Sequence, residues 1–567
     1  MQKLINLLKS LDGQGYKSYR CLQGEYQFSN FKLYIDHVQG DPFAEPSRCR
    51  LELPLASTSL PPQLYDNSIR RIALEDYLGR RMLAAIRSVA RLKRGSGRSG
   101  EFDMSSYGQE VLRRSNLLIE QSSIEVRLAI GLPADNRRID ADYAQIMLIS
   151  SLPSIVDSAL LQAGKDLKRV THHVNSIEDQ QYLREQLADR GLIAFIADGS
   201  ILARRSGVDN RVMDAAVKIL APETMACEIP LKHRAPVRGI AFPKGINLIV
   251  GGGFHGKSTL LRAIEQGVYD HIPGDGRELV VSDASCFKLR AEDGRAITGV
   301  DIRPFINNLP RGEDCAFFTT GNASGSSSQA AGIIEAISTG AKTLLIDEDT
   351  SATNFLIRDL RMQSLVPKNK EPITPLLHRI RQLRDQQDVS VVMVMGGSGD
   401  YFSVADRVVM MDSYQPLDLT REAHQLADFD TSAELESIDI EQQSARIPEP
   451  GCLSSLIPSG KSKIKAFGTR LLQYGEEEIA LQCLEQLADS AQLLAIGYLI
   501  EHFQRDRAAQ GVDLVSALAN EIALLEQRGF DRITTYPMGK LAQPRLQELV
   551  AVVNRMRLLE LRRPESE

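Results

Sequence analysis

Residues 251–258 read Gly251-Gly252-Gly253-Phe254-His255-Gly256-Lys257-Ser258 and match the phosphate-binding pattern G-x-x-x-x-G-K-[ST] at every fixed position. An apolar run, 246–250, precedes them, and a run with helical spacing, 259–264, follows. This order of strand, loop and helix suits phosphate binding, because loop N–H groups and the positive end of the helix dipole converge on phosphate oxygens. The stretch therefore predicts an α/β nucleotide-binding core, with a chance glycine-rich turn as the alternative.

The residue types in this loop predict how ATP or GTP would be held. Lys257 is expected to reach the β- and γ-phosphates, and Ser258 is expected to ligate Mg²⁺. The residues of this loop expected to contact the nucleotide are Gly251, Gly252, Gly253, Phe254, His255, Gly256, Lys257, Ser258 and Thr259.

A second strand with an acidic end completes the prediction of a hydrolytic site. The apolar run 343–346 leads into Asp347 and Glu348. Asp347 is expected to hold Mg²⁺, directly or through water, and Glu348 to orient and deprotonate the attacking water, because the two carboxylates need separate tasks. A buried strand that ends in a solvated acidic turn is the alternative.

The acidic end and the residues before it resemble parts of ABC ATPases. Residues 347–354, Asp-Glu-Asp-Thr-Ser-Ala-Thr-Asn, resemble the Walker B motif and D-loop of that class. Ser324-Gly325-Ser326-Ser327-Ser328-Gln329 lies near the place of the signature Leu-Ser-Gly-Gly-Gln, and a helix-like stretch follows it. The resemblance implies that Ser324, Gly325 and Ser326 face the γ-phosphate bound by a second subunit. A hydroxyl and glycine N–H groups at a helix N-terminus suit an anion, although a Gly/Ser loop alone is more often a turn.

More specifically, the chain resembles the small family of predicted ATPases of the ABC class. Blocks that ordinary ABC proteins lack carry this resemblance, and they are 36–44, 131–134, 271–278, 290–295 and 396–402. It implies an α/β P-loop NTPase core of ABC type, an α+β N-terminal domain and a small, mainly helical C-terminal domain. It also implies ATP and Mg²⁺ as cofactors, slow hydrolysis, a homodimer and an association with RNA.

Two features depart from ordinary ABC proteins around the acidic strand. Asp349 stands where a proline usually follows the catalytic glutamate, and Thr353-Asn354 replaces the usual Leu-Asp.

Only 67 residues separate Lys257 from Ser324. That span leaves little room for the helical subdomain that docks membrane partners of transporters, and the Q-loop has no clear position in it.

A third departure concerns the switch histidine, which should close the strand 391–395. Gly396-Gly397-Ser398-Gly399-Asp400 follows instead. Ser398 and Asp400 are candidate substitutes, and the absence of a histidine beside the γ-phosphate argues against fast turnover.

Composition and length limit the class of protein. A chain of 567 residues with 25% charged residues is expected to be a multidomain soluble protein. The seven cysteines are scattered, without a C-x-x-C pair, which argues against a disulfide framework or a zinc site. No unbroken apolar run of membrane-spanning length and no signal-peptide pattern is found, so a cytoplasmic location without a membrane partner is expected.

The pattern along the chain predicts four regions. Residues 1–165 contain strand signals at 31–35 and 126–130 and helical spacing at 69–92. Alternating strands and helices predict the ATPase domain at 166–445, and a polar, proline-containing segment predicts a linker at 446–465. The remaining residues, 466–567, have helical spacing.

One stretch is strongly basic although the chain has a net charge of −6. Nine Lys/Arg and only two acids lie between Arg70 and Arg98. Such a helix running into a Gly/Ser loop suits contact with phosphate backbones, and a solvated helix face is the equal alternative. The candidate nucleic-acid contacts are Arg91, Lys93, Arg94 and Arg98.

Three functions remain open on the sequence. The leading hypothesis is an ABC-class ATPase that closes as a homodimer over two ATP and acts on RNA. The second is a nucleotide-gated scaffold with negligible turnover, which the absent switch histidine favours. The third is a small-molecule kinase, against which the signature-like loop and the Asp347-Glu348 pair argue.

Overall fold

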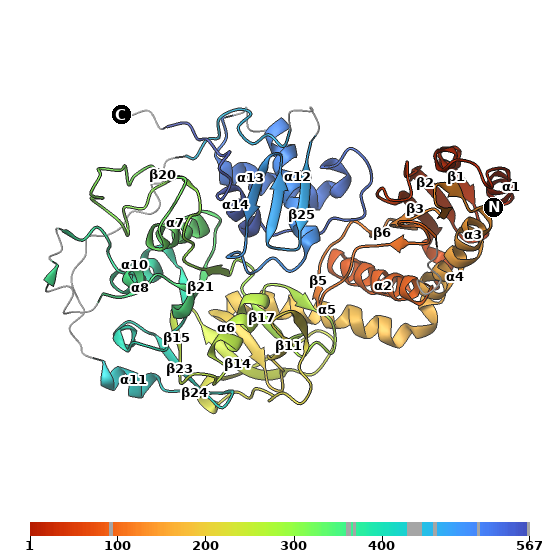
Figure 1. Ribbon diagram of the computed structural model, residues 1–567. Coiled ribbons are helices and arrows are strands. Elements are labelled where there is room, and N and C mark those ends of the chain that lie inside the picture. The colour runs from red at the N-terminus through yellow and green to blue at the C-terminus, as the bar shows by residue number, and fades with distance from the viewer. Residues whose placement is uncertain are drawn as a thin grey trace. The chain divides into compact units, whose positions relative to one another are not determined.

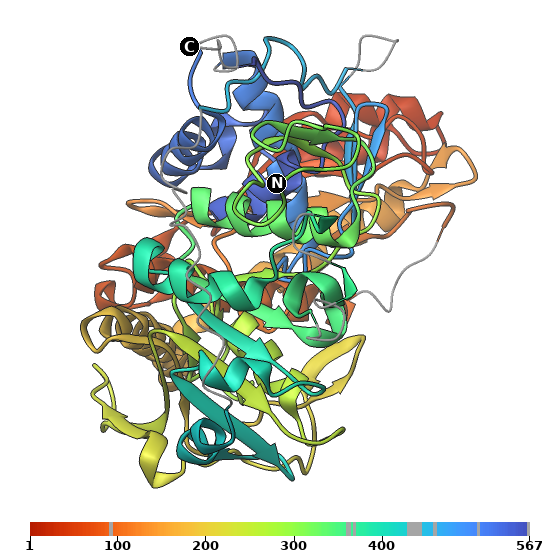
Figure 2. The same ribbon diagram turned by 90° about the vertical axis from the view of Figure 1, so that its left-hand side faces the viewer.

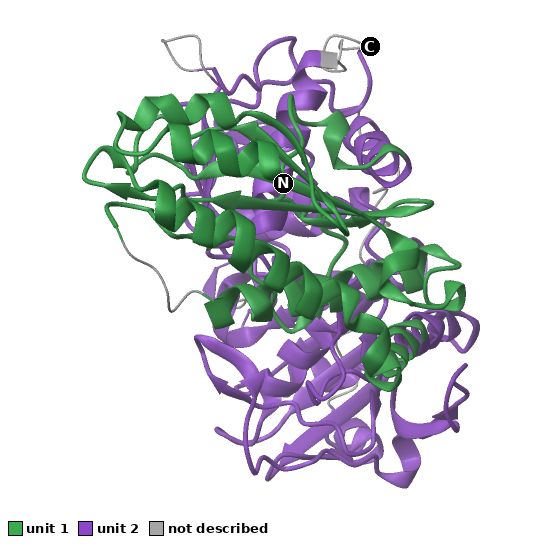
Figure 3. Cartoon of the chain, turned by 90° about the vertical axis from the view of Figure 1, so that its right-hand side faces the viewer, with its two compact units in different colours: residues 1–178, 528–543 green, residues 179–527, 544–567 purple. Residues whose placement is uncertain are grey.

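The computed structural model describes residues 1–89, 95–358, 365–366, 370–427, 445–456, 462–506 and 511–563. The chain forms two compact units, shown in Figure 3. Unit 1 holds residues 1–178 and 528–543, and unit 2 holds residues 179–527 and 544–567. The predicted domain boundaries at 165, 445 and 465 stay a prediction.

Unit 1 is built on an antiparallel sheet, in which strands pair in the order β1-β2-β3-β7-β4 and β6 also pairs with β7. The strands are β1 (Gly24–Gln27), β2 (Lys32–His37), β3 (Ser47–Pro54), β4 (Phe102–Asp103), β6 (Leu117–Ile119) and β7 (Ser123–Ile130). Buried and more exposed residues alternate along β3, as expected for a sheet with one covered face.

The helices of unit 1 include the predicted basic helix, which is α2 and runs from Ser68 to Val89. The others are α1 (Gln2–Ser10), α3 (Ala141–Gln145), α4 (Leu152–Val156) and the start of α5 (Leu167–Asp189). The helical stretch Ala141–Asp189 is the one part of the described chain long and apolar enough to cross a membrane, and 44% of its most apolar window is buried within the protein. Core helices pass the same test. The expectation from unbroken apolar runs missed this window because serines and Asp157 interrupt it.

Unit 2 contains the predicted parallel sheet, with strand order β18-β21-β22-β15-β23-β24 (Figure 1). Neighbours from β18 to β23 are parallel, and β24 is antiparallel to β23. Figure 2 shows the later strands of this sheet in teal. The strands are β15 (Ile246–Val250), β18 (Phe287–Leu289), β21 (Thr343–Asp347), β22 (Ser390–Val394), β23 (Arg407–Asp412) and β24 (Gln415–Asp418).

Burial explains why most residues of β15 and β21 are apolar. Ile246, Leu248 and Ile249 are fully buried, as are Leu344 and Leu345. A parallel strand covered on both faces is expected to have such a nearly continuous apolar run. The parallel arrangement brings the ends of β15, β21 and β22 to one edge of the sheet, where the glycine-rich loop and the acidic pair lie.

Helices follow the strands of this sheet, and a second sheet accompanies it. The helices are α6 (Lys257–Gln266), α7 (Gly325–Ser338), α8 (Thr353–Leu356), α10 (Leu376–Gln387) and α11 (Thr420–Leu426). The second sheet is antiparallel, in the order β13-β14-β10-β17. Its strands are β10 (Leu192–Ala197), β13 (Ala226–Ile229), β14 (Val237–Pro243) and β17 (Val280–Ser282).

The C-terminal region is mainly helical but begins with three antiparallel strands that helical spacing did not predict. They are β25 (Ile464–Phe467), β26 (Leu471–Tyr474) and β27 (Glu477–Ala480), and the helices are α12 (Ser490–Asp506), α13 (Leu514–Arg528) and α14 (Leu546–Val553). Ile479 is buried between two exposed neighbours in β27, so a two-residue period is present there. The preceding segment includes buried Arg446 and Leu453.

Candidate functional site: the nucleotide-binding edge of the parallel sheet

The glycine-rich loop turns sharply between β15 and α6. Gly251, Phe254 and Gly256 have φ of +130°, +64° and +97°. A β-carbon on Gly251 would lie 2.5 Å from the carbonyl oxygen of Met411, so no side chain fits there. Phe254 adopts a left-handed conformation at a strain of about 1–3 kcal/mol, and its side chain is 99% exposed. Strained residues of this kind cluster at ligand-binding loops.

Lys257, Ser258 and Thr259 form the first turn of α6, which begins two residues before the predicted helical run 259–264. The ammonium group of Lys257 donates to the carbonyl oxygens of Gly251 (2.7 Å) and Gly252 (2.8 Å). The lysine thus lies over the loop whose N–H groups are expected to receive phosphates. Ser258 is exposed at the same end of the helix.

The turn between β23 and β24 holds the loop from the side, which the sequence did not reveal. The N–H of Ser413 donates to Nδ1 of His255 at 2.9 Å, and the N–H of Tyr414 donates to the carbonyl oxygen of His255 at 3.2 Å. Nδ1 of His255 also lies 3.1 Å from a carboxylate oxygen of Asp412. The imidazole of His255 therefore has partners within the protein, and its predicted contact with nucleotide stays a prediction.

Asp347 and Glu348 lie at the end of β21, as predicted. Asp347 is buried, and its Oδ1 accepts a hydrogen bond from the N–H of Asp349 at 3.2 Å. Oε2 of Glu348 accepts hydrogen bonds from the N–H groups of Gly396 (2.6 Å) and Gly397 (2.9 Å). The residues that replace a switch histidine therefore contact Glu348 through backbone N–H groups.

Gly396 lies close both to the lysine of the glycine-rich loop and to the glutamate at the end of β21. A β-carbon on Gly396 would lie 3.8 Å from both Oε2 of Glu348 and Nζ of Lys257. Lys257 and Glu348, which are 91 positions apart in the chain, are thus neighbours at the sheet edge. Ser398 and Asp400, the candidate substitutes for the histidine, bond to each other: the Ser398 hydroxyl donates to Asp400 at 2.5 Å.

The predicted donors for a magnesium ion are the hydroxyl of Ser258 and the carboxylate of Asp347, and this assignment stays a prediction. Both are oxygen ligands of the kind that Mg²⁺ prefers, and Mg²⁺ in such sites takes one or two protein ligands together with substrate phosphates. One observation is compatible with this assignment: within the described part of the chain, the Asp347 carboxylate accepts one hydrogen bond, from the N–H of Asp349 to Oδ1 at 3.2 Å. The residues present therefore fit the ion.

Ser324 forms the N-cap of α7, because its side chain accepts a hydrogen bond from the N–H of Ser327. Ser324 is exposed, but Ser326 is buried and its hydroxyl donates to Asn354 at 2.8 Å. The side chain of Ser326 is thus directed at the residue that departs from the usual D-loop. The predicted contacts of Ser324, Gly325 and Ser326 with nucleotide stay predictions.

Gln329 connects the signature-like helix to the acidic turn. Its side chain is fully buried, donates to the hydroxyl of Ser351 at 2.9 Å and accepts from the N–H of Ala352 at 3.0 Å. Both partners lie just after Glu348. These two hydrogen bonds therefore connect α7 to the segment that follows β21.

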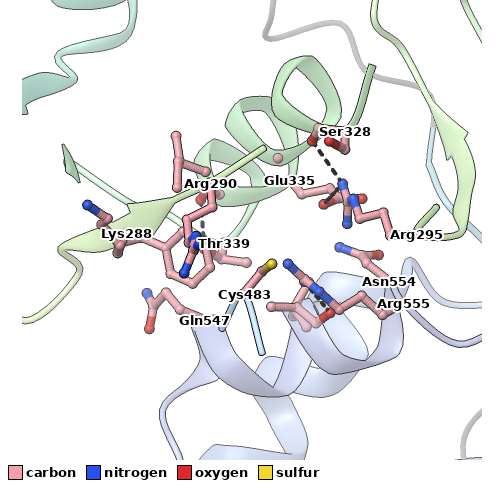
Figure 4. Close-up of a pocket in the computed structure, with 16 residues that line it drawn as sticks. Lys288, Arg290, Arg295, Ser328, Glu335, Thr339, Cys483, Gln547, Asn554 and Arg555 are labelled. Atoms are coloured by element: carbon pink, nitrogen blue, oxygen red, sulfur yellow. Dashed lines mark hydrogen bonds and ion pairs between the residues drawn. The ribbon is translucent and has the colours of Figure 1, made fainter. Parts of the chain in front are cut away.

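A small polar cavity of about 20 Å³ lies along α7 (Figure 4). The guanidinium of Arg295 points at Glu335 of α7 and donates to its carboxylate at 2.8 Å. The hydroxyl of Ser328 accepts from the N–H of Glu292 (2.8 Å), and the carboxylate of Glu292 accepts from Arg555 (3.0 Å). These contacts link α7 to the segment that follows α14.

Two buried ionisable side chains lie behind the site. Burial, with a smaller effect of the Glu485 charge, raises the pKa of Glu265 in α6 to about 7. Burial lowers the pKa of Lys288 in β18, against the opposing effect of nearby carboxylates that include Glu265 and Asp347. Burial thus shifts both groups toward their uncharged forms.

Several arginines of the basic stretch in unit 1 are bound within the protein, which the count of charges did not predict. Arg91, Lys93 and Arg94 lie outside the described residues, and Arg98 is exposed. In α2, Arg70 is buried against Glu178 (2.5 Å), and Arg80 pairs with buried Asp76 (2.7 Å). Arg81 donates to the carbonyl oxygens of Ala159 (2.8 Å) and Ser158 (2.6 Å). These three arginines bind within the protein, so they do not form a basic face for a nucleic acid.

Comparisons with known proteins give relatives of part of the chain. An uncharacterised protein of Methanocaldococcus jannaschii is 32% identical over 286 residues, which are 48% of this chain. The chain spans 62% of the length of that relative. Solved structures with low overall similarity include an ATP-binding cassette of an ABC transporter in its ADP conformation (11% identity, TM-score 0.25, 42% of this chain and 96% of the other). Another is cbiO1 of Clostridium perfringens, part of an ABC transporter complex (12% identity, TM-score 0.26, 42% and 92%).

Family models match three consecutive parts of the chain. Residues 1–163 match the N-terminal domain of ATPases of the ABC class, and residues 166–446 match the P-loop domain of ABC ATPases. Residues 463–562 match the C-terminal domain described for MRB1590. With the parallel sheet and its glycine-rich loop, these matches confirm the predicted fold class and the P-loop nucleotide-binding domain. The chain belongs to the family of predicted ATPases of the ABC class.

Proposed function

We propose that the chain is a slow, Mg²⁺-dependent ATPase that closes as a homodimer over two ATP molecules and couples this cycle to RNA binding. The observation that carries the proposal is the proximity of Lys257 and Glu348 at the edge of the parallel sheet, where a single position beside Gly396 is 3.8 Å from both. A phosphate-binding cation and a carboxylate near a candidate magnesium ligand are the groups that hydrolysis of a γ-phosphate needs.

Each residue then has a separate task. Lys257 and the loop N–H groups hold the β- and γ-phosphates, while Ser258 and Asp347 hold Mg²⁺. The ion supplies charge neutralisation at the phosphate oxygens. Glu348 orients the attacking water and accepts its proton.

The homodimer is supported by the surroundings of the signature-like loop. The side chains nearest to a β-carbon on Gly325 would be those of Ala291, Asp293 and Ala352, rather than residues of the phosphate-binding loop. Ser324 is exposed at the start of a 14-residue helix, and a hydroxyl group at a helix N-terminus suits a phosphate. A second copy would supply that phosphate together with its own loop.

The RNA part of the proposal rests on a smaller surface than the sequence suggested. Arg98 is exposed and lies in a turn, and its backbone N–H donates to the carbonyl oxygen of Pro42. The neighbouring Ser96 accepts from the N–H of Asn136, which places exposed Arg137 on the adjoining loop. Two exposed guanidinium groups on adjoining loops suit phosphate contact, and that of Arg137 also pairs with Asp41 at 3.1 Å.

The test is phosphate release by the full chain with Mg-ATP, with and without total cellular RNA. Glu348→Gln and Lys257→Ala are expected to reduce release to background, and Glu348→Gln is expected to elute as a dimer when ATP is saturating. Wild-type release equal to that of Lys257→Ala would contradict the ATPase, and a monomeric Glu348→Gln protein with bound ATP would contradict the dimer.

A nucleotide-gated scaffold is the second candidate, and one observation favours it. Glu348 is held by two N–H groups rather than facing a histidine. ATP binding without release above background, and with unchanged RNA affinity in Glu348→Gln, would support the scaffold.

A further inference from the structure

The loop after β22 presents two backbone N–H groups to one carboxylate oxygen. Gly396 and Gly397 donate to Oε2 of Glu348 at 2.6 and 2.9 Å. Both glycines are exposed, and the bond between Ser398 and Asp400 closes the turn that follows them. The N–H of Asp400 also donates to the Ser398 hydroxyl at 3.1 Å. The two donors are therefore fixed in direction and accessible from outside.

Space, rather than backbone conformation, explains glycine at position 397. Neither Gly396 nor Gly397 is among the residues with positive φ. A β-carbon on Gly397 would lie 2.8 Å from Oε1 of Glu348, closer than such contacts occur, and the three atoms nearest to it all belong to that carboxyl group. Glycine at this place lets an anion with two oxygens approach the N–H pair.

The same donors suit the terminal phosphate of a nucleotide. Adjacent N–H groups that converge on one point bind anionic oxygens in general, and hydrogen bonds to charged acceptors are the strong ones. Lys257, the expected phosphate ligand, is within 3.9 Å of a β-carbon placed on Gly396. A γ-phosphate drawn toward Lys257 would meet the N–H pair that Glu348 occupies.

We propose that the N–H groups of Gly396 and Gly397 form a γ-phosphate sensor that holds Glu348 while the site is empty. The γ-phosphate of a nucleoside triphosphate competes for the N–H pair and releases the carboxylate toward the attacking water. A diphosphate lacks the competing group and leaves Glu348 in place. The inference rests on the nucleotide binding in the proposed function, but not on hydrolysis.

The test compares the affinities for ATP and ADP of the full chain by calorimetry with Mg²⁺. Glu348→Ala frees the N–H pair, so the affinity for ATP is expected to rise about tenfold while that for ADP stays the same, since a charged hydrogen-bond acceptor no longer competes. Asp349→Asn is the matched control, because it removes a neighbouring exposed carboxylate that does not contact the N–H pair. It is expected to leave the ratio of the two affinities unchanged.

A second variant, Gly397→Ala, distinguishes the proposed sensor from simple repulsion between the Glu348 carboxylate and the phosphates. In Gly397→Ala the β-carbon takes the place of the second anion oxygen, so adding Glu348→Ala is expected to give no further gain in ATP affinity. Such non-additivity is the mark of residues that act through one contact. A gain that persists in the Gly397→Ala background, or an equal gain for ATP and ADP, would overturn the proposal.

The outcomes are distinguishable from failure of the proposed function. If Gly397→Ala does not fold, as judged by circular dichroism, the ATP-to-ADP ratio of Glu348→Ala against Asp349→Asn decides alone. Normal ATP binding with no phosphate release would overturn the ATPase and leave the sensor. A wild-type chain that binds neither nucleotide would overturn both.

Discussion

The nucleotide-binding edge in unit 2 and the basic helix α2 in unit 1 are both identified in the sequence by their charged residues. In the structure, however, the charged side chains of the two regions have different surroundings. At the sheet edge, Lys257 and Glu348 are only partly buried and lie beside exposed glycines. In α2, Arg70 and Arg80 are bound to carboxylates within the protein. A motif with fixed spacing encodes a geometry, whereas a count of charges does not reveal where the charged groups point.

The largest expected effect tests the functional side of this comparison. Lys257→Ala is expected to lower kcat/KM for ATP by about 100- to 1000-fold, the loss typical of removing one charge-stabilising donor. Lys244→Ala is the matched control, since Lys244 is half-exposed and its nearest carboxylate, Asp388, is 3.4 Å away on the surface. Steady-state phosphate release measures both. Equal activity of the two variants would place the site elsewhere.

The structural side of the comparison predicts a stability effect for α2. Arg70→Ala leaves the buried carboxylate of Glu178 without its guanidinium partner and is expected to destabilise the protein by about 3–5 kcal/mol. Arg81→Ala, on the same helix, removes hydrogen bonds to neutral carbonyl oxygens and a 6.0 Å contact with the ring of Tyr77, and a smaller loss is expected. Urea unfolding followed by circular dichroism compares them. If Arg70→Ala lost RNA affinity without losing stability, α2 would be a nucleic-acid surface after all.

These contrasts show how far the sequence predicts this molecule. The glycine-rich loop was predictable because its geometry restricts the residue types: a side chain on Gly251 would meet the backbone of Met411. The N–H groups of Gly396 and Gly397 were not, because backbone donors are common to all residues except proline, and the missing histidine was the only signal.

Long-range partners explain the other differences. Arg70 pairs with Glu178, 108 positions away in the chain, so local charge gave no indication of the buried pair. The hairpin that holds His255 comes from residues 158 positions away. The strands β25 to β27 are four residues each, too short for periodicity to separate them from a helix.

A feature that the two regions share sharpens the comparison, because each contains a buried glutamate with a raised pKa. Burial raises the pKa of Glu75 in α2 to about 7, against the lowering effect of the N–H of Ile119. Burial also raises that of Glu265 in α6 to about 7. The unfolded chain loses these protons near pH 4.5, so the folded chain holds more protons between pH 4.5 and 7 and its stability falls as pH rises through that window.

Glu75→Gln and Glu265→Gln are each expected to remove the part of this pH dependence of stability that is caused by the substituted carboxyl group. Between pH 4.5 and pH 8, the free energy of unfolding of each variant is expected to rise by about 3 kcal/mol relative to that of the wild type. This value follows from a pKa difference of roughly 2.5 units between the folded and unfolded chains. Urea unfolding at several pH values measures the difference. Parallel pH profiles for variant and wild type would show that the carboxylate in question is charged in the folded protein.

The smallest expected effect concerns Arg98, the candidate nucleic-acid contact that the described residues include. Arg98→Ala is expected to weaken RNA binding by a few-fold at low salt and to reduce the slope of log affinity against log salt by about 1, the change for one lost phosphate contact. Arg169→Ala is the control, because Arg169 is an exposed arginine of the same unit with its side chain 81% exposed. Fluorescence anisotropy with a labelled single-stranded RNA gives both values. Equal slopes for the two variants would assign Arg98 to the solvated surface, so that the charge of this residue, like that of Arg70 and Arg80, would give no evidence of RNA binding.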